Sequence, residues 1–125
     1  MVIKPQTKLE VRYIDEVMGF GVFAGEFIPN GTIIETCYFI KLFVVATHPS
    51  YDYVFTDVND NDTSYLPFGY GSIYNHSSHP NCDWRIKSKE LNIMEFYSIK
   101  DIEEGEEIAH HYGPMYWKSR EKKLV

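Results

Sequence analysis

The chain has 125 residues, which suits one compact domain, and 44% of them are hydrophobic, which is enough for a single core. Its formal net charge of −6 makes nucleic acid a poor default partner, because phosphate binding favours a basic surface, whereas a Lys/Arg-rich peptide would be attracted. No apolar run approaches the roughly 18 residues that span a bilayer, so we expect no membrane segment.

The N-terminus and the cysteines indicate the compartment. Met1–Pro5 lacks the long apolar stretch of a secretory signal, and the chain has only two cysteines, Cys37 and Cys82. We therefore expect free thiols in a reducing, intracellular setting, either cytoplasm or nucleus, including that of a host cell. The aromatic content of 16% favours a β-rich core, with an aromatic channel or clamp as the alternative.

The first half of the chain predicts strands separated by turns. Leu9–Tyr13 alternates apolar and polar residues, as a half-buried strand does. Asp15–Gly19 is predicted to turn and Gly21–Ala24 to continue extended. Pro29–Gly31 has turn chemistry, because proline fixes φ and Asn-Gly tolerates a positive φ. Thr32–Val45 is rich in β-branched and aromatic residues and predicts one or two strands.

Further strands are predicted in the second half. Tyr51–Thr56 and Thr63–Leu66 flank an acidic loop. Cys82–Lys87 and Leu91–Ser98 are expected to form a hairpin that turns at Ser88–Glu90.

The C-terminal part begins with an acidic turn. Asp101–Glu107 forms that turn around a central glycine, and Glu107–Tyr112 is expected to be extended. Pro114 suits the first turn of a short helix over Met115–Lys122. Short strands with frequent turns predict a mainly β fold.

Gly19-Phe20-Gly21 is a weak signal when taken alone. Glycines let the backbone turn sharply and let a ligand approach its amides, but an ordinary hairpin turn explains this pattern better. The pattern does not open a helix, which argues against a dinucleotide-binding fingerprint.

The histidines offer a metal-binding alternative. His76, His79 and Cys82 are spaced three apart and His110 lies downstream, so these four side chains could bind zinc in an interaction protein. Pro80 would disturb the helix that such spacing exploits, which makes this the weaker interpretation.

Three segments carry a stronger signal when they are combined: Gly19–Ala24, Asn75–Asn81 and Gly105–Tyr112. The middle one reads Asn-His-Ser-x-x-Pro-Asn, and together they resemble the SET-domain protein lysine methyltransferases, notably the compact viral SET proteins. The similarity continues through Leu66–Tyr74 and Tyr116-Trp117. It spans about residues 9 to 118 of a single domain over 1 to 125.

The resemblance implies a fold of small curved β-sheets whose C-terminal segment threads beneath a loop like a pseudoknot. It also implies S-adenosylmethionine as the cofactor. The backbone of Gly19-Phe20-Gly21 would contact the methionine part of that cofactor. Asn75 and the backbone of His76 would hold its amino group and adenine, and Trp117 would pack on the adenine ring.

The resemblance further assigns the substrate side of the site. Tyr112 matches the catalytic tyrosine at the mouth of a narrow lysine channel, and Tyr53 resembles a channel-lining tyrosine, with Trp84 bordering the channel. The chain departs from the family at His110-His111, where an aromatic residue and Asp are usual. This change bears on the polarity of the channel.

The cysteine count implies that no zinc-binding modules flank the domain. The channel would then be closed by the C-terminal segment around Tyr116-Trp117 or by a second subunit, which makes a homodimer an option. The implied reaction is methyl transfer to a lysine ε-amine in a basic protein segment such as a histone tail. The main alternative is a SET-like module that binds peptide or cofactor without turnover.

Overall fold

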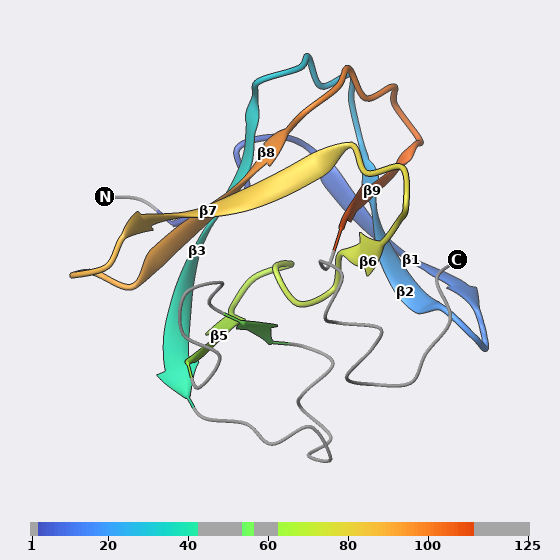
Figure 1. Ribbon diagram of the computed structural model, residues 1–125. Coiled ribbons are helices and arrows are strands. Elements are labelled where there is room, and N and C mark those ends of the chain that lie inside the picture. The colour runs from blue at the N-terminus through green and yellow to red at the C-terminus, as the bar shows by residue number, and fades with distance from the viewer. Residues whose placement is uncertain (1–2, 43–53, 57–62, 112–125) are drawn as a thin grey trace.

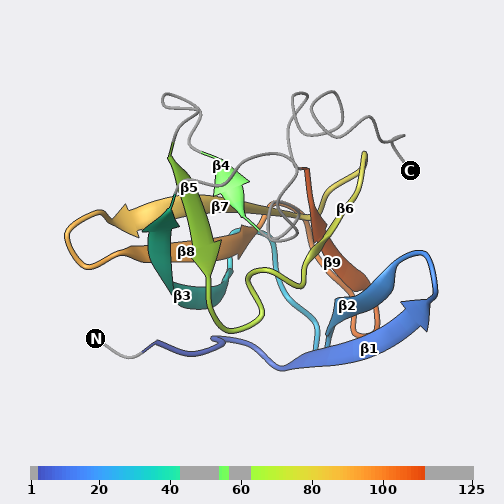
Figure 2. The same cartoon turned by 90° about the horizontal axis from the view of Figure 1, so that it is seen from below.

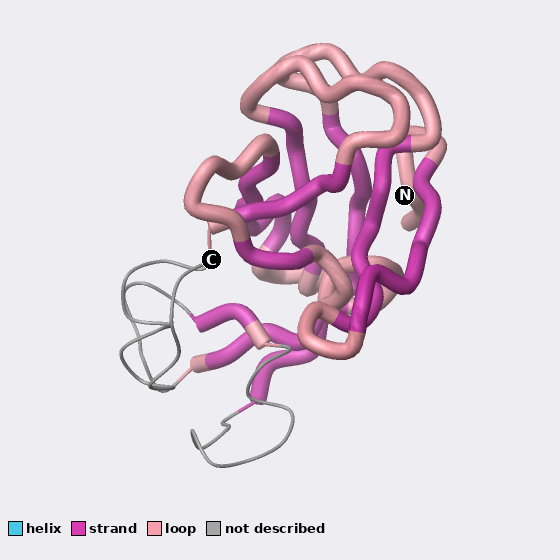
Figure 3. The backbone as a smooth tube through the Cα atoms, turned by 90° about the vertical axis from the view of Figure 1, so that its right-hand side faces the viewer, coloured by secondary structure: helices cyan, strands magenta, loops and turns pink. Residues whose placement is uncertain are grey.

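The computed structural model describes residues 3–42, 54–56 and 63–111. This part of the chain is built from strands and loops and contains no helix (Figure 3). It accordingly has no helical segment with the length and apolar character of a membrane span. The mainly β architecture predicted from the sequence is confirmed.

The nine strands found in residues 3–42, 54–56 and 63–111 belong to two curved sheets that lie side by side (Figure 1). The first sheet has the order β1 (Leu9–Asp15), β2 (Gly19–Ala24), β9 (Glu107–His110), β6 (Asn75–His76). The second has the order β4 (Phe55–Thr56), β5 (Ser64–Pro67), β3 (Ile33–Leu42), β8 (Ile93–Ser98), β7 (Cys82–Ser88).

The β1–β2 hairpin follows from its turn chemistry. The Asp15 carboxylate accepts hydrogen bonds from the backbone N–H groups of Val17 and Met18 at 2.9 and 2.7 Å. Gly19 closes the turn at a φ of +70°, a conformation that glycine adopts without steric cost. The hairpin then pairs antiparallel, with Val11 opposite Val22.

The β7–β8 hairpin corrects one boundary. Its turn spans residues 89–92 rather than Ser88–Glu90, and β8 begins at Ile93 instead of Leu91. Asn92 has a φ of 56°, which a small polar side chain tolerates, and the register shifts between Ile86 and Ser88. The left-handed residue therefore delays the start of the strand by two positions.

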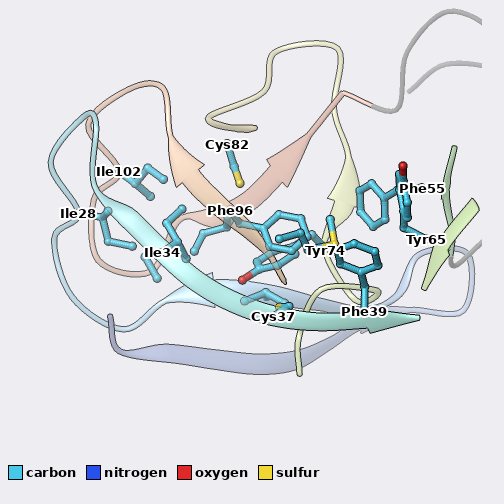
Figure 4. Packing of buried hydrophobic residues seen from close by; sticks show 14 residues of the cluster. Ile28, Ile34, Cys37, Phe39, Phe55, Tyr65, Tyr74, Cys82, Phe96 and Ile102 are labelled. Carbon is cyan, nitrogen blue, oxygen red and sulfur yellow. The ribbon is translucent and has the colours of Figure 1, made fainter. Parts of the chain in front are cut away.

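The core gathers side chains from both sheets around Phe96 and Tyr74, whose ring centroids lie 4.7 Å apart (Figure 4). Cys37 and Cys82 are free thiols buried in the same cluster. Burying one large apolar side chain contributes about 1.5–3 kcal/mol, so this cluster holds the two sheets together.

The Asn75–Asn81 segment contains more regular structure than its turn-prone residues predict. Asn75 and His76 form the short strand β6, which runs parallel to β9 with Asn75 opposite Ala109 and His76 opposite His110. Figure 2 shows β6, β9 and β2 next to one another. Segments more than 30 positions apart in the sequence are thereby brought to one place.

Candidate functional site

The site is built around Gly21, where three strands meet. A Cβ atom at Gly21 would stand 2.6 Å from Glu107 Oε2, 2.8 Å from Ile14 Cδ1 and 2.9 Å from Asn75 Nδ2. Real Cβ atoms essentially never approach other atoms this closely. Any other residue at this position would therefore displace the ends of these three side chains.

The side-chain amide of Asn75 is held from two directions. Its Nδ2 donates to Glu107 Oε2 at 2.7 Å and to the carbonyl oxygen of Phe20 at 3.1 Å. Both amide protons are thereby used, which fixes the orientation of the group. Its Oδ1 accepts no hydrogen bond from the described part of the chain, so it can accept one from a ligand's ammonium.

Asn81 closes the loop that follows β6. Its Nδ2 donates to the carbonyl oxygen of Glu107 at 2.9 Å, and its Oδ1 accepts from the N–H of Ala109 at 3.0 Å. Its own backbone N–H donates to the Ala109 carbonyl at 3.1 Å. One side chain thus extends the pairing along β9 after β6 has ended.

Three histidines lie at the end of β9. The rings of His76 and His111 stand 4.9 Å apart in an edge arrangement, and His110 is fully buried behind them. Burial lowers the pKa of His76 to about 4, with a further contribution from His111, and burial lowers the pKa of His110 to about 3. Both buried rings are therefore neutral at pH 7, so this end of β9 carries no fixed positive charge from them.

An aromatic cluster adjoins the histidines. Phe55 of β4 lies 5.0 Å from the His110 ring and 5.1 Å from the Trp84 ring of β7, measured between centroids. Tyr65 of β5 lies 6.5 Å from Trp84. This cluster lies beside His110, two positions before Tyr112 in the sequence.

The described residues contain no group of three or more His, Cys, Asp or Glu side chains that could hold a metal ion. Cys82 is buried in the hydrophobic core, whereas His79 is exposed. The four side chains of the zinc alternative therefore do not form a ligand set.

The structure brings together the predicted cofactor residues of the first and second segments, which are Gly19, Phe20, Gly21, Asn75 and His76. The predicted residues Tyr53, Tyr112 and Trp117 lie outside the described residues, as does the expected helix over Met115–Lys122.

The roles of Glu107 and Asn81 were missed at the level of the sequence, although both residues stand inside the quoted motifs. Their side chains bind partners that the fold alone brings near. The signal that could have identified them is that each motif contains one hydrogen-bonding side chain, the Glu107 carboxylate or the Asn81 amide, and that the two motifs were expected to lie close together.

Comparisons with known proteins agree with this geometry. The sequence model of the SET domain matches residues 19–113. A Schizosaccharomyces pombe protein named histone-lysine N-methyltransferase, H3 lysine-37 specific, is 32% identical over 116 residues, which cover 90% of this chain and 78% of that protein.

A solved structure extends the likeness to three dimensions. It is the crystal structure of a candidate histone methyltransferase from Plasmodium falciparum, with a TM-score of 0.70 and 30% sequence identity. The match covers 90% of this chain and 98% of that one. The chain therefore belongs to the SET-domain family of protein-lysine methyltransferases.

Proposed function

We propose that this protein binds S-adenosylmethionine and methylates a lysine ε-amine in a basic protein segment such as a histone tail. The observation that carries the proposal is the meeting of Gly21, Asn75 and Glu107 from three distant segments. The two relatives, whose names describe histone methyltransferases, support a histone-like substrate.

The residues present suit this cofactor. Gly21 lets the side chains of Asn75 and Glu107 pack close to its backbone, and the accepting Oδ1 of Asn75 suits an α-ammonium group. The backbone of Gly19-Phe20-Gly21 and of His76 would complete the contacts, with Trp117 against the adenine. S-adenosylmethionine, when bound, supplies the methyl group and a sulfonium charge that disfavours a nearby ammonium.

The chemical difficulty lies in the lysine. With a pKa of about 10.4, only about one lysine in a thousand is neutral near pH 7.4, a handicap of about 4 kcal/mol at 1.36 kcal/mol per unit. A channel lined by aromatic rings such as Phe55 and Trp84 would lower this pKa, because a desolvated ammonium is disfavoured. The lysine can then lose its proton to water without a dedicated base.

In this proposal Tyr112 positions the reacting groups rather than removing the proton. Its hydroxyl, together with backbone carbonyls, would orient the methyl through weak C–H···O contacts. Tyr53 would line the channel and hold the lysine side chain in line. Correct positioning of two reactants supplies a large share of the acceleration.

The net charge of −6 supports a basic partner. We propose that this partner binds as an extended segment that pairs with a strand of the protein. A substrate of this kind supports an intracellular location, in cytoplasm or nucleus. We also propose that a second subunit can complete the channel.

The decisive experiment is mass spectrometry of purified histones and of a cell lysate, each incubated with the protein and an isotope-labelled methyl donor. Labelled methyl-lysine in the wild type, and far less in Tyr112→Phe, supports the proposal. Binding of the donor without any labelled lysine would favour the alternative of a SET-like binding module without turnover.

A further inference from the structure

Glu35 of β3 is a carboxyl buried in the core, with 1% of its surface exposed. Its Oε1 accepts a hydrogen bond from the Tyr74 hydroxyl at 2.7 Å, and its Oε2 accepts one from the backbone N–H of Tyr70 at 3.0 Å. Both bonds reach the coil of residues 68–74, which joins β5 to β6.

The coil is shaped to meet this carboxyl. Gly69 has a φ of +77°, and a Cβ atom there would stand 2.5 Å from Glu35 Oε2. At Gly71 a Cβ atom would stand 2.6 Å from the Cβ of Pro67. A larger residue at Gly69 or Gly71 would displace Glu35 or Pro67. Glycine at both positions therefore allows the coil to pack closely around the Glu35 carboxyl.

The burial of Glu35 has an energetic cost that packing does not explain. Desolvation raises the pKa of Glu35, although the hydrogen bonds from the Tyr70 N–H, the Tyr74 hydroxyl and the Cys37 thiol oppose this. An apolar side chain at the same place would avoid the cost of burying a carboxyl. The carboxyl instead orients the coil, because its two oxygens hold the Tyr70 N–H and the Tyr74 hydroxyl in fixed positions within one short segment.

That segment leads directly into the site. Tyr74 is tied to Glu35 by its hydroxyl and packed on Phe96, and the next residue is Asn75. The Asn75 amide meets its two acceptors at 2.7 and 3.1 Å, and hydrogen bonds weaken steeply when distance and angle depart from such values.

We propose that Glu35 is a positioning residue that sets Asn75 and His76 through Tyr74 and thereby tunes affinity for the methyl donor. The inference rests on the proposed function, in which Asn75 and His76 hold S-adenosylmethionine. In this role Glu35 acts through Tyr74 and does not contact the donor or the lysine directly. It belongs to the second sheet and acts from there on the first.

The variants separate positioning from stability. In Glu35→Gln the amide oxygen can accept from the Tyr70 N–H while its NH₂ donates to the Tyr74 hydroxyl, so both links survive. Glu35→Ala removes both links and Tyr74→Phe removes one. Glu95→Ala is the matched control, because Glu95 is also a buried glutamate, 4% exposed, but binds Arg85 rather than the coil.

Titration calorimetry with S-adenosylhomocysteine, the demethylated donor, tests the proposal at a temperature where circular dichroism shows each variant folded. We expect Glu35→Ala and Tyr74→Phe to bind about tenfold more weakly, with Glu35→Gln close to wild type. We expect Glu95→Ala to lose stability without losing affinity. At saturating donor, the KM for a lysine peptide should be unchanged in all of them.

A second measurement uses the protein without donor. The NMR signals of the Asn75 side-chain amide should shift in Glu35→Ala and Tyr74→Phe and stay in place in Glu95→Ala. Unchanged amide signals, or equal loss of affinity in Glu35→Ala and Glu95→Ala, would overturn the positioning role. A folded wild type that does not bind the donor would instead overturn the proposed function. Should Glu35→Ala not fold, Tyr74→Phe, which removes a single oxygen, decides the question.

Discussion

The side-chain amide of Asn75 donates a 2.7 Å hydrogen bond to the carboxylate of Glu107, 32 positions later in the chain. The bond links β6 to β9 beside Gly21, so it joins all three motifs by which the sequence resembles its family. Hydrogen bonds to charged groups are stronger than neutral ones, about 1.5–3 kcal/mol each. This link therefore has enough energy to hold the Asn75 amide in one orientation.

Replacing Glu107 should weaken donor binding more than it weakens the fold. Glu107→Ala leaves Asn75 with one acceptor, so we expect the Kd for S-adenosylhomocysteine to rise about tenfold. Glu104→Ala is the control, because Glu104 is an exposed glutamate of the preceding turn. Calorimetry on both variants checks this, and equal affinities would contradict a role for the carboxylate.

Gly21→Ala should disrupt the site and the fold together. The added methyl would lie within 3.0 Å of side-chain atoms of Glu107, Ile14 and Asn75. Overpacking of this kind costs about 1–3 kcal/mol, and displacement of Asn75 should abolish detectable donor binding.

Gly31→Ala is the matched control for Gly21→Ala. It adds a methyl in open space at a φ of +84°, so it should strain the backbone and leave binding intact. Urea unfolding and calorimetry on both variants separate the two effects. Wild-type affinity in Gly21→Ala would show that the crowding at this glycine does not shape the site.

Tyr112→Phe should lower turnover sharply while donor affinity stays close to wild type. The change removes only the hydroxyl that we propose orients the methyl and the amine, and the ring remains. Single-turnover transfer to a lysine peptide, set beside calorimetry with S-adenosylhomocysteine, checks the expectation. Undiminished transfer would assign the orienting role elsewhere.

Added salt should weaken the binding of a basic substrate. The net charge of −6 attracts a Lys/Arg-rich peptide. Salt screens this attraction, and the screening length falls to about 8 Å at an ionic strength of 0.15 M. We expect the KM for such a peptide to rise between low and high salt, while the Kd for S-adenosylhomocysteine, a zwitterion without net charge, changes little. A KM that is insensitive to salt would argue against long-range attraction.

Local sequence patterns predicted the longer antiparallel strands well. Leu9–Tyr13 lies within β1, and the run of β-branched and aromatic residues after Thr32 contains β3. The alternation in Leu9–Tyr13 wrongly predicted a half-buried strand, because Val11 and Tyr13 are exposed. The strand β6 escaped prediction because two polar residues become a strand only when β9 lies alongside. That pairing depends on the whole topology, which only the family resemblance supplied.

The burial of Glu35 was not predicted from the sequence, for a similar reason. Glu35 stands between Ile34 and Thr36 in a strand whose register shifts between Ile33 and Glu35, so simple alternation does not give the face that it occupies. Its environment comes from the 68–74 coil, which meets β3 through a hydrogen bond from Phe68 to Tyr38 at 2.9 Å. Tertiary contacts of this kind leave no local pattern.

Because His76 and His110 are buried, we expect the protein to lose stability as the pH falls. His110 has a folded pKa of about 3 because burial disfavours its charged form, whereas an unfolded histidine titrates near 6.5. Between these values the unfolded chain binds more protons than the folded one. The free energy of unfolding should therefore decrease as the pH drops below about 6.5, by up to about 1.4 kcal/mol per unit for each such histidine.

His110→Gln should flatten this pH dependence, because glutamine does not titrate. His79→Gln is the control, since His79 is exposed and should leave the profile unchanged. Urea unfolding at half-unit steps from pH 4.5 to 8 gives both slopes. Since His76, with a folded pKa of about 4, contributes with the same sign, part of the slope should survive in His110→Gln, and the histidine contribution should be lost when both positions are replaced. A wild-type profile that is flat across this range would mean that these rings bind protons in the folded protein as they do in the unfolded chain, so that burial does not keep them neutral.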